Sequence, residues 1–147
     1  MVTIRDLLKV KGNNVWSVPP GASVLDALKV MADKDVGALL IIDRGKILGI
    51  LSERDLARSV AKTEKCILDT AVLEYMTRDV ITMGPDQTVD DCLRLMTNQH
   101  IRHLPIVEGD DLLGLVSIGD LVKESLSSRD STINHLEDYI EGSGYGH

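Results

Sequence analysis

Aromatic side chains are scarce in this sequence, which contains no phenylalanine, one tryptophan and three tyrosines. Proteins that bind single-stranded nucleic acid stack successive bases on several aromatic rings, so the composition argues against such a surface. Because apolar residues still make up 44% of the 147-residue chain, aliphatic side chains, methionine and alanine suffice to build a core.

The sequence also lacks an excess of positive charge, since its formal net charge at pH 7 is −7. General nucleic-acid binding needs a basic surface that displaces counterions, so the charge argues against this function. A single nucleotide is not excluded, because a few local hydrogen-bond donors suffice to hold it.

Paired cysteines, a membrane-spanning run and a secretion signal are missing as well. Cys66 and Cys92 show no C-x-x-C spacing and are interpreted as reduced thiols. No apolar run approaches the roughly 20 residues that cross a bilayer. The N-terminal stretch MVTIRDLLKVKG has no continuous apolar region of the kind found in a secretion signal. We therefore expect a cytoplasmic protein without a membrane partner.

What the sequence does contain is an internal repeat. LGILSERDLAR at 48–58 and LGLVSIGDLVK at 113–123 share Leu-Gly, an apolar pair, Ser, two free positions, Asp and Leu. A shift of 65 residues extends this match without a gap over most of the chain. The matched pairs include Val15 with Val80, Pro20 with Pro85, Val24 with Val89, Asp26 with Asp91, Met31 with Met96, Leu39 with Leu104, Gly49 with Gly114, Ser52 with Ser117 and Asp55 with Asp120.

Each copy predicts the same order of elements, β-α-β-β-α. An extended piece, VWSV at 15–18 or VITM at 80–83, leads into a helix that Ser23 or Thr88 caps. Two apolar runs follow, ALLIID and KILGIL in the first copy and HLPIVE and LLGLVS in the second, and the glycine-containing turns between them predict hairpins. A Ser-x-x-Asp motif then opens a second helix.

One copy, of about 60 residues, would bury so little surface that it would be only marginally stable alone. We therefore expect an α/β (α+β) fold in which two tandem β-α-β-β-α repeats pack sheet to sheet with pseudo-two-fold symmetry. The predicted domains are residues 1–65 and 66–127. Residues 128–141 predict an amphipathic helix that either docks on its own module or contributes to a dimer, and 142–147 predict a mobile tail.

These features together resemble a tandem pair of cystathionine-β-synthase (CBS) domains, also called a Bateman module, over about residues 4–126. The specific marks are GILSERDL and GLVSIGDL, the YMT that opens the second copy, and RHLPIV as its proline-containing strand. The second copy is also similar to small stand-alone members of the family from bacteria and plant organelles.

The resemblance implies a regulatory module that binds an adenosyl ligand in the cleft between the repeats. AMP is the first candidate, and ATP, ADP, NAD(H) and S-adenosylmethionine are the others. The resemblance further implies a sensor rather than an enzyme, a homodimer, and an output that passes to an unknown effector protein.

The Ser-x-x-Asp motif has a structural and a binding interpretation, and the two are compatible. Structurally, Ser52 with Asp55, and Ser117 with Asp120, cap the helix that follows. In binding, the helix N-terminus and the Ser hydroxyl receive a phosphate, and the Asp accepts hydrogen bonds from both ribose hydroxyls. A glycine three residues before each Ser permits close approach of backbone or ligand.

Positive charge differs between the two copies. Arg54 lies inside the first motif, where it either contacts phosphate or stays solvated. The second motif has Gly119 there, so its positive charge must come from elsewhere, and Arg102 and His103 are the candidates. On a strand these two point to opposite faces, so at most one is expected to enter a given cleft directly. Pro105 cannot donate to a ladder and predicts an edge or an interrupted strand with backbone groups free for an adenine edge. The other candidate ligand-binding residues lie on the predicted strands and are Val15, Ala38 and Ile81.

Two other functions are compatible with part of the pattern. A nucleotide-processing enzyme would use Asp55 or Asp120 as a base, but the chain has no Walker-type glycine loop and no nucleophile with a base at an interpretable spacing. His100 and His103 have no further ligand nearby, so no metal is expected. The remaining alternative is a ligand-free assembly module, in which both motifs are only caps.

Overall fold

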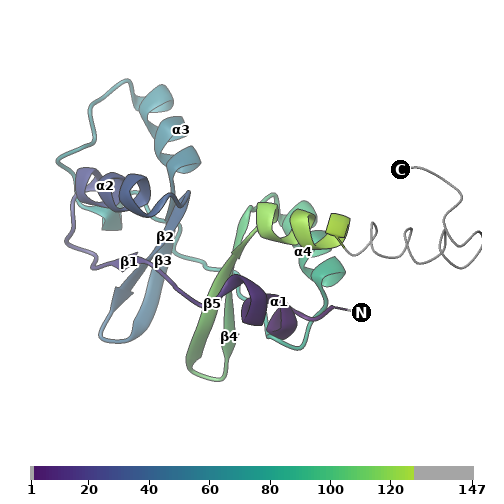
Figure 1. The fold of residues 1–147 in the computed structure, drawn as a ribbon. Helices are drawn as coiled ribbons and strands as arrows, with labels where there is room; N and C mark the ends of the chain where they lie inside the picture. Colours follow the sequence, from purple (N-terminus) through teal and green to yellow (C-terminus); the bar gives the residue numbers. More distant parts are fainter. Residues whose placement is uncertain (1, 128–147) are drawn as a thin grey trace, which may run out of the picture. The chain divides into compact units, whose positions relative to one another are not determined.

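The computed structural model describes residues 2–127, so the helix predicted at 128–141 and the tail predicted at 142–147 lie outside the described residues. The chain forms two compact units (Figure 1). One unit comprises residues 14–81, and the other joins residues 2–13 to residues 82–127. Both units contain helices and a small sheet, which confirms the predicted mixed fold of two repeats.

The unit of residues 14–81 contains the complete predicted β-α-β-β-α order. Its elements are β1 (Ser17–Val18), α2 (Val24–Lys34), β2 (Ala38–Asp43), β3 (Lys46–Ser52), α3 (Glu53–Thr63) and the 3₁₀ turn η1 (Val72–Glu74). The sheet order is β1-β2-β3, with β1 parallel and β3 antiparallel to β2. The hairpin turn falls at Arg44 and Gly45, as predicted, and both residues adopt the positive φ that such tight turns require.

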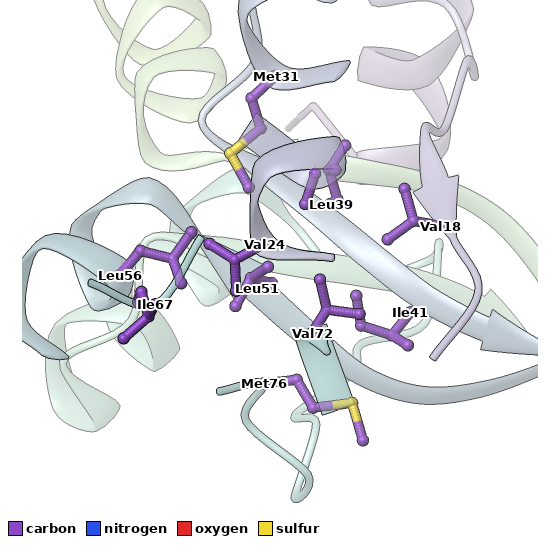
Figure 2. Close-up of a cluster of buried hydrophobic side chains, with 11 residues drawn as sticks. Val18, Val24, Met31, Leu39, Ile41, Leu51, Leu56, Ile67, Val72 and Met76 are labelled. Carbon is purple, nitrogen blue, oxygen red and sulfur yellow. The ribbon is translucent and has the colours of Figure 1, made fainter. Parts of the chain in front are cut away.

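The core of this unit lies between α2, the sheet and η1 (Figure 2). Alternate residues of β2, Leu39 and Ile41, share one apolar cluster with Val24 of α2 and Val72 of η1. All four side chains are fully buried. Burial of each such aliphatic side chain stabilises the fold by roughly 1.5–3 kcal/mol.

The other unit contains α1 (Ile4–Lys11), α4 (Val89–Gln99), β4 (His103–Glu108) and β5 (Asp111–Ser117), and residues 118–127 are helical. Strands β4 and β5 pair antiparallel with the same register as β2 and β3, including an irregularity after Ile106 that corresponds to the one after Ile41. Thr88 caps α4 and Ser23 caps α2 through identical capping boxes, so both predicted caps are confirmed.

The strand predicted at 80–83 is not formed, and only Met83 makes an isolated bridge, to Ile106. The physical reason is Pro105. In the first repeat the backbone N–H of Leu40 donates to the carbonyl of Trp16 at 3.2 Å, whereas Pro105 stands at the matching position and has no N–H to donate. Of the two predicted alternatives, an edge or an interrupted strand, the edge is confirmed, because Pro105 lies in the continuous strand β4 of a two-stranded sheet. The extended piece VITM is reduced to one bridge.

The segments that precede the two repeats take corresponding places in the two units. Val72 N–H donates to the Ala22 carbonyl at 2.8 Å, and Ile4 N–H donates to the Gln87 carbonyl at 2.9 Å. Residues 1–13 are predicted to belong to the first repeat, but α1 packs in the unit of the second. The boundaries 1–65 and 66–127 therefore remain a description of the sequence repeat, since the compact units are divided at Asn13 and Ile81.

Within residues 2–127 no helix is long and apolar enough to span a membrane.

Candidate functional site

Both Ser-x-x-Asp motifs stand where a strand ends and a helix begins. The Oγ of Ser52 accepts a hydrogen bond from the backbone N–H of Asp55 at 3.1 Å, and the Oγ of Ser117 accepts one from Asp120 at the same distance. The predicted capping role is therefore confirmed in both repeats.

The first turn of each helix is also tied to the preceding loop. Glu53 N–H donates to the Gly37 carbonyl at 3.0 Å, and Ile118 N–H donates to the Arg102 carbonyl at 2.8 Å. Two of the first three backbone N–H groups of each helix are thus used within the protein. The sequence predicts a helix terminus whose free N–H groups receive a phosphate. Fewer backbone N–H donors remain for an anion than this prediction assumes.

The two Asp carboxylates differ in what they contact. Asp120 Oδ2 accepts a hydrogen bond from Ser117 N–H at 2.8 Å, which closes the capping box. In the first repeat Ser52 caps α3, but no reciprocal bond from its N–H to Asp55 is formed. The carboxylate of Asp120 is therefore held in place by a bond that Asp55 does not make.

Asp120 has a second partner, which the sequence motif does not predict. The ammonium of Lys11, the last residue of α1, lies 3.1 Å from Asp120 Oδ2, and both side chains are partly exposed, at 29% and 27%. Lys11 Nζ also donates to the Leu115 carbonyl at 2.6 Å. The replacement of Arg54 by Gly119 signals that this motif needs a cation from elsewhere, but no spacing in the sequence points to a residue more than 100 positions away.

The other candidates of the first repeat lie close to its motif or on the neighbouring strand. Ala38 is buried on β2 directly opposite Ser52. Arg54 lies exposed in the first turn of α3, and Val15 is half-buried just before β1.

The candidates of the second repeat lie mostly on β4. His103 is half-buried directly opposite Ser117, and Pro105 is buried opposite Leu115. Arg102 is exposed just before the strand, and its carbonyl accepts the hydrogen bond from Ile118 N–H at the start of the following helix. Ile81 is half-buried at the end of the unit of residues 14–81.

The glycines before the motifs are explained by packing. A Cβ at Gly49 would lie 2.5 Å from Met76 Sδ, and one at Gly114 would lie 2.7 Å from Leu8 Cδ2. The close approach predicted at these positions is therefore made by the protein's own side chains. Each glycine lets the segment before a repeat pack tightly against the second hairpin strand.

Other features of the described residues do not add to this site. No group of three or more His, Cys, Asp or Glu side chains there is arranged to hold a metal, and His100 forms the left-handed C-cap of α4. A shallow hollow of about 380 Å³ lies along α1 beside Pro85 and Leu113, but none of the predicted ligand-binding residues lines it.

Comparison with known proteins places this geometry in a family. The family model for the CBS domain matches residues 10–62 and 72–127. The mitochondrial CBS domain-containing protein CBSX3 of Arabidopsis thaliana is 33% identical over 97% of this chain and 73% of its own length.

Solved structures agree with this assignment. A protein with CBS domains from Burkholderia ambifaria MC40-6 is 43% identical, with a TM-score of 0.81 over 86% of this chain and 95% of its own. The CBS domain pair of protein MJ0100, solved in complex with 5′-methylthioadenosine and S-adenosyl-L-methionine, is 25% identical, with a TM-score of 0.76 over 87% of this chain and 98% of its own. With two copies of the domain over most of its length, the chain belongs to the CBS-domain family.

Proposed function

We propose that this protein is a regulatory module that binds an adenosine-containing ligand, with AMP as the first candidate. The observation that carries the proposal is the repeated motif. In both repeats an Asp stands in the first turn of a helix, three residues after a Ser that ends the second hairpin strand. The CBS domain pair of MJ0100, which shares the fold, was solved with two adenosyl compounds bound.

The residues of the second repeat fit the ribose of such a ligand. Both contacts of the Asp120 carboxylate use Oδ2, so Oδ1 is the atom that accepts a ribose hydroxyl. Ser117 and His103 lie at the same end of the β4–β5 hairpin and add polar groups beside it. The Ser117 hydroxyl retains its donor, since it acts as an acceptor in the cap.

The first repeat has the same Ser and Asp side chains, but its Asp carboxylate is held by fewer hydrogen bonds. The Asp55 carboxylate is not closed into a capping box, so it turns toward a diol without losing a cap bond. Arg54 supplies the charge for a phosphate. Ala38, Val15, Pro105 and Ile81 are proposed to supply apolar surface for the base, since the Pro105 carbonyl already accepts a hydrogen bond from Met83 N–H at 3.1 Å.

AMP is proposed ahead of ADP, ATP, NAD(H) and S-adenosylmethionine, and the module acts by binding rather than by catalysis. Binding changes the balance between conformations or dimer arrangements only as far as the ligand prefers one of them. The proposed output is the association of a homodimer with an effector protein, and cytoplasmic location stays a prediction from the sequence.

One observation favours a second candidate, a ligand-free assembly module. Asp120 already has a structural role, because it closes a capping box and pairs with Lys11. A carboxylate with two partners inside its own unit explains the second motif without any ligand.

Thermal unfolding of ligand-stripped protein with each of the adenosyl compounds separates the two candidates. A ligand at about 100 times its dissociation constant stabilises the folded state by roughly 2.7 kcal/mol per site, which raises Tm by several degrees. We expect AMP to raise Tm in the unchanged protein and in Asp110→Ala, a matched control in the hairpin turn.

The same ligand-induced shift should be lost in Asp120→Ala and reduced in Asp55→Ala. A Tm that no compound changes would reject the sensor and favour the assembly module. An AMP shift of equal size in all four proteins would reject the assignment of the ribose to these two carboxylates.

A further inference from the structure

Lys11 is held beside Asp120 by the packing of α1 on its own unit. Thr3 caps the helix, Leu8 packs against Gly114, and the N–H of Gly12 closes the C-terminal end by donating to the Leu8 carbonyl at 2.8 Å. Lys11, the last residue of α1, therefore lies at the strand-to-helix junction of the second repeat because the helix is packed against that unit.

The same position in the other unit is occupied by backbone instead of a cation. Ile50, the counterpart of Leu115, exchanges two backbone hydrogen bonds with Thr77, at 3.0 and 2.8 Å. Leu115 instead receives the Lys11 ammonium on its carbonyl at 2.6 Å. The segment before the first repeat thus brings the Lys11 ammonium to the motif that lacks an arginine. In the other unit the arginine that follows Thr77, Arg78, donates to the Leu73 carbonyl at 3.3 Å.

We propose that Lys11 makes the second repeat prefer adenosine ligands that carry a phosphate over neutral nucleosides, an inference that rests on the proposed function. An ammonium has three donors, and its contacts to Leu115 and Asp120 account for two of them. The third is directed to an anionic group of the ligand, at a side chain that is 29% exposed.

The positive charge of Lys11 explains why the preference favours phosphate-bearing ligands over neutral nucleosides. A neutral nucleoside hydrogen-bonds to Asp120 through its ribose and offers the Lys11 ammonium no anionic partner. A phosphate instead gains a charge-assisted hydrogen bond, and two of the first three backbone N–H groups of the neighbouring helix are already used. Lys11 therefore acts on the ratio of the two affinities more than on either affinity alone.

Titration calorimetry with AMP and with adenosine, on the full chain and its variants, tests this inference. Lys11→Met removes the charge and keeps the length of the side chain. We expect it to weaken AMP binding about tenfold or more, because hydrogen bonds to charged groups are the strong ones, and to change adenosine binding less than about twofold. Lys11→Arg should retain the preference, and Lys9→Met, which removes a lysine from the same helix, should leave both affinities unchanged.

A second measurement does not depend on any variant. In the unchanged protein, added salt should weaken AMP binding and leave adenosine binding nearly constant, because salt screens only the charged contact.

The outcomes separate this inference from the function on which it rests. If neither compound binds the unchanged protein, the proposed function fails and the preference fails with it. If both bind and Lys11→Met weakens them equally, or changes neither, the proposed function stands and Lys11 does not select for phosphate.

Discussion

Leu8 of α1 lies against Gly114 of β5, so close that a Cβ on the glycine would stand 2.7 Å from the leucine Cδ2. In the other unit Gly49 of β3 has the same relationship with the segment that ends in Met76 and Thr77. A Cβ there would stand 2.5 Å from Met76 Sδ and 2.7 Å from the Thr77 carbonyl oxygen. Both contacts are closer than real Cβ atoms allow, but they differ in what must move.

Gly49→Ala should therefore destabilise the protein more than Gly114→Ala. The methyl group at 49 meets the carbonyl oxygen of Thr77, which accepts a hydrogen bond from Ile50 N–H in a residue that also donates its own N–H to the Ile50 carbonyl. The methyl group at 114 meets the end of a side chain that can rotate. Overpacking of this kind typically costs about 1–3 kcal/mol, and we place Gly49→Ala in the upper half of this range. Urea unfolding monitored by circular dichroism measures the difference.

Gly84→Ala is the matched control, because a Cβ there would meet nothing within 4 Å. It should change the free energy of unfolding by less than about 1 kcal/mol, in either direction. Equal losses at 49 and 114 would contradict the distinction between backbone and side-chain contacts.

The hairpins were the part of the fold that sequence pattern predicted best. The runs ALLIID and HLPIVE coincide with β2 and β4, because strongly apolar runs of this length bounded by glycine turns have few other structures available. Both copies predict a short extended piece before the first helix, at 15–18 and at 80–83, and both pieces form less strand than expected. Extension of a short segment depends on a partner's hydrogen bonds, and Pro105 removes one of them.

Each repeat is preceded by a segment that packs in the unit of the other repeat, and this arrangement could not be predicted from the repeat itself. A shift of 65 residues aligns the helices and hairpins and says nothing about which unit a preceding segment joins. That choice is made by tertiary contacts such as Ile4 N–H to the Gln87 carbonyl. For the same reason Lys11 was missed, whereas the local bonds of Ser52 and Ser117, which span three residues, were predicted correctly.

Asp120→Ala should destabilise the ligand-free protein more than Asp55→Ala, by about 1 kcal/mol. Both variants keep the bond from the backbone N–H to the Ser hydroxyl and lose the same interaction with the helix dipole. Only Asp120→Ala also loses the bond from Ser117 N–H and the pair with Lys11, and that partly exposed pair contributes little.

The free energies of unfolding in urea, measured without ligand, give this difference. Equal values for the two variants would mean that the reciprocal bond of the second cap contributes no stability.

Acid should weaken the caps of α1 and α4. Hydrogen bonds from the Thr88 backbone and then its hydroxyl hold the pKa of Asp91 below its ordinary value of 3.8. The Thr3 hydroxyl and then its backbone N–H do the same for the pKa of Asp6. A lowered pKa in the folded state stabilises that state above the ordinary value, and this stabilisation is lost as the pH falls through the lower, folded value.

Between pH 6 and pH 3, the Tm of the double variant Asp6→Asn with Asp91→Asn should therefore fall less than the Tm of the unchanged protein. Asp110→Asn, in an exposed hairpin turn, should behave like the unchanged protein. An identical pH dependence in all three proteins would show that neither cap carboxylate contributes to acid unfolding.

The two cysteines should differ sharply in their reaction with 5,5′-dithiobis(2-nitrobenzoate) at pH 8. Cys66 is exposed, whereas Cys92 is buried against the core of its unit. Burial, with a smaller contribution from the charge of Asp91, raises the pKa of the Cys92 thiol to about 11, and only the thiolate attacks the reagent. We expect one fast thiol per native chain, two after unfolding in guanidinium chloride, and none in native Cys66→Ser. Rapid labelling of native Cys66→Ser would show that the unit opens at α4 on the timescale of the reaction, and that the packing of Cys92 does not protect it.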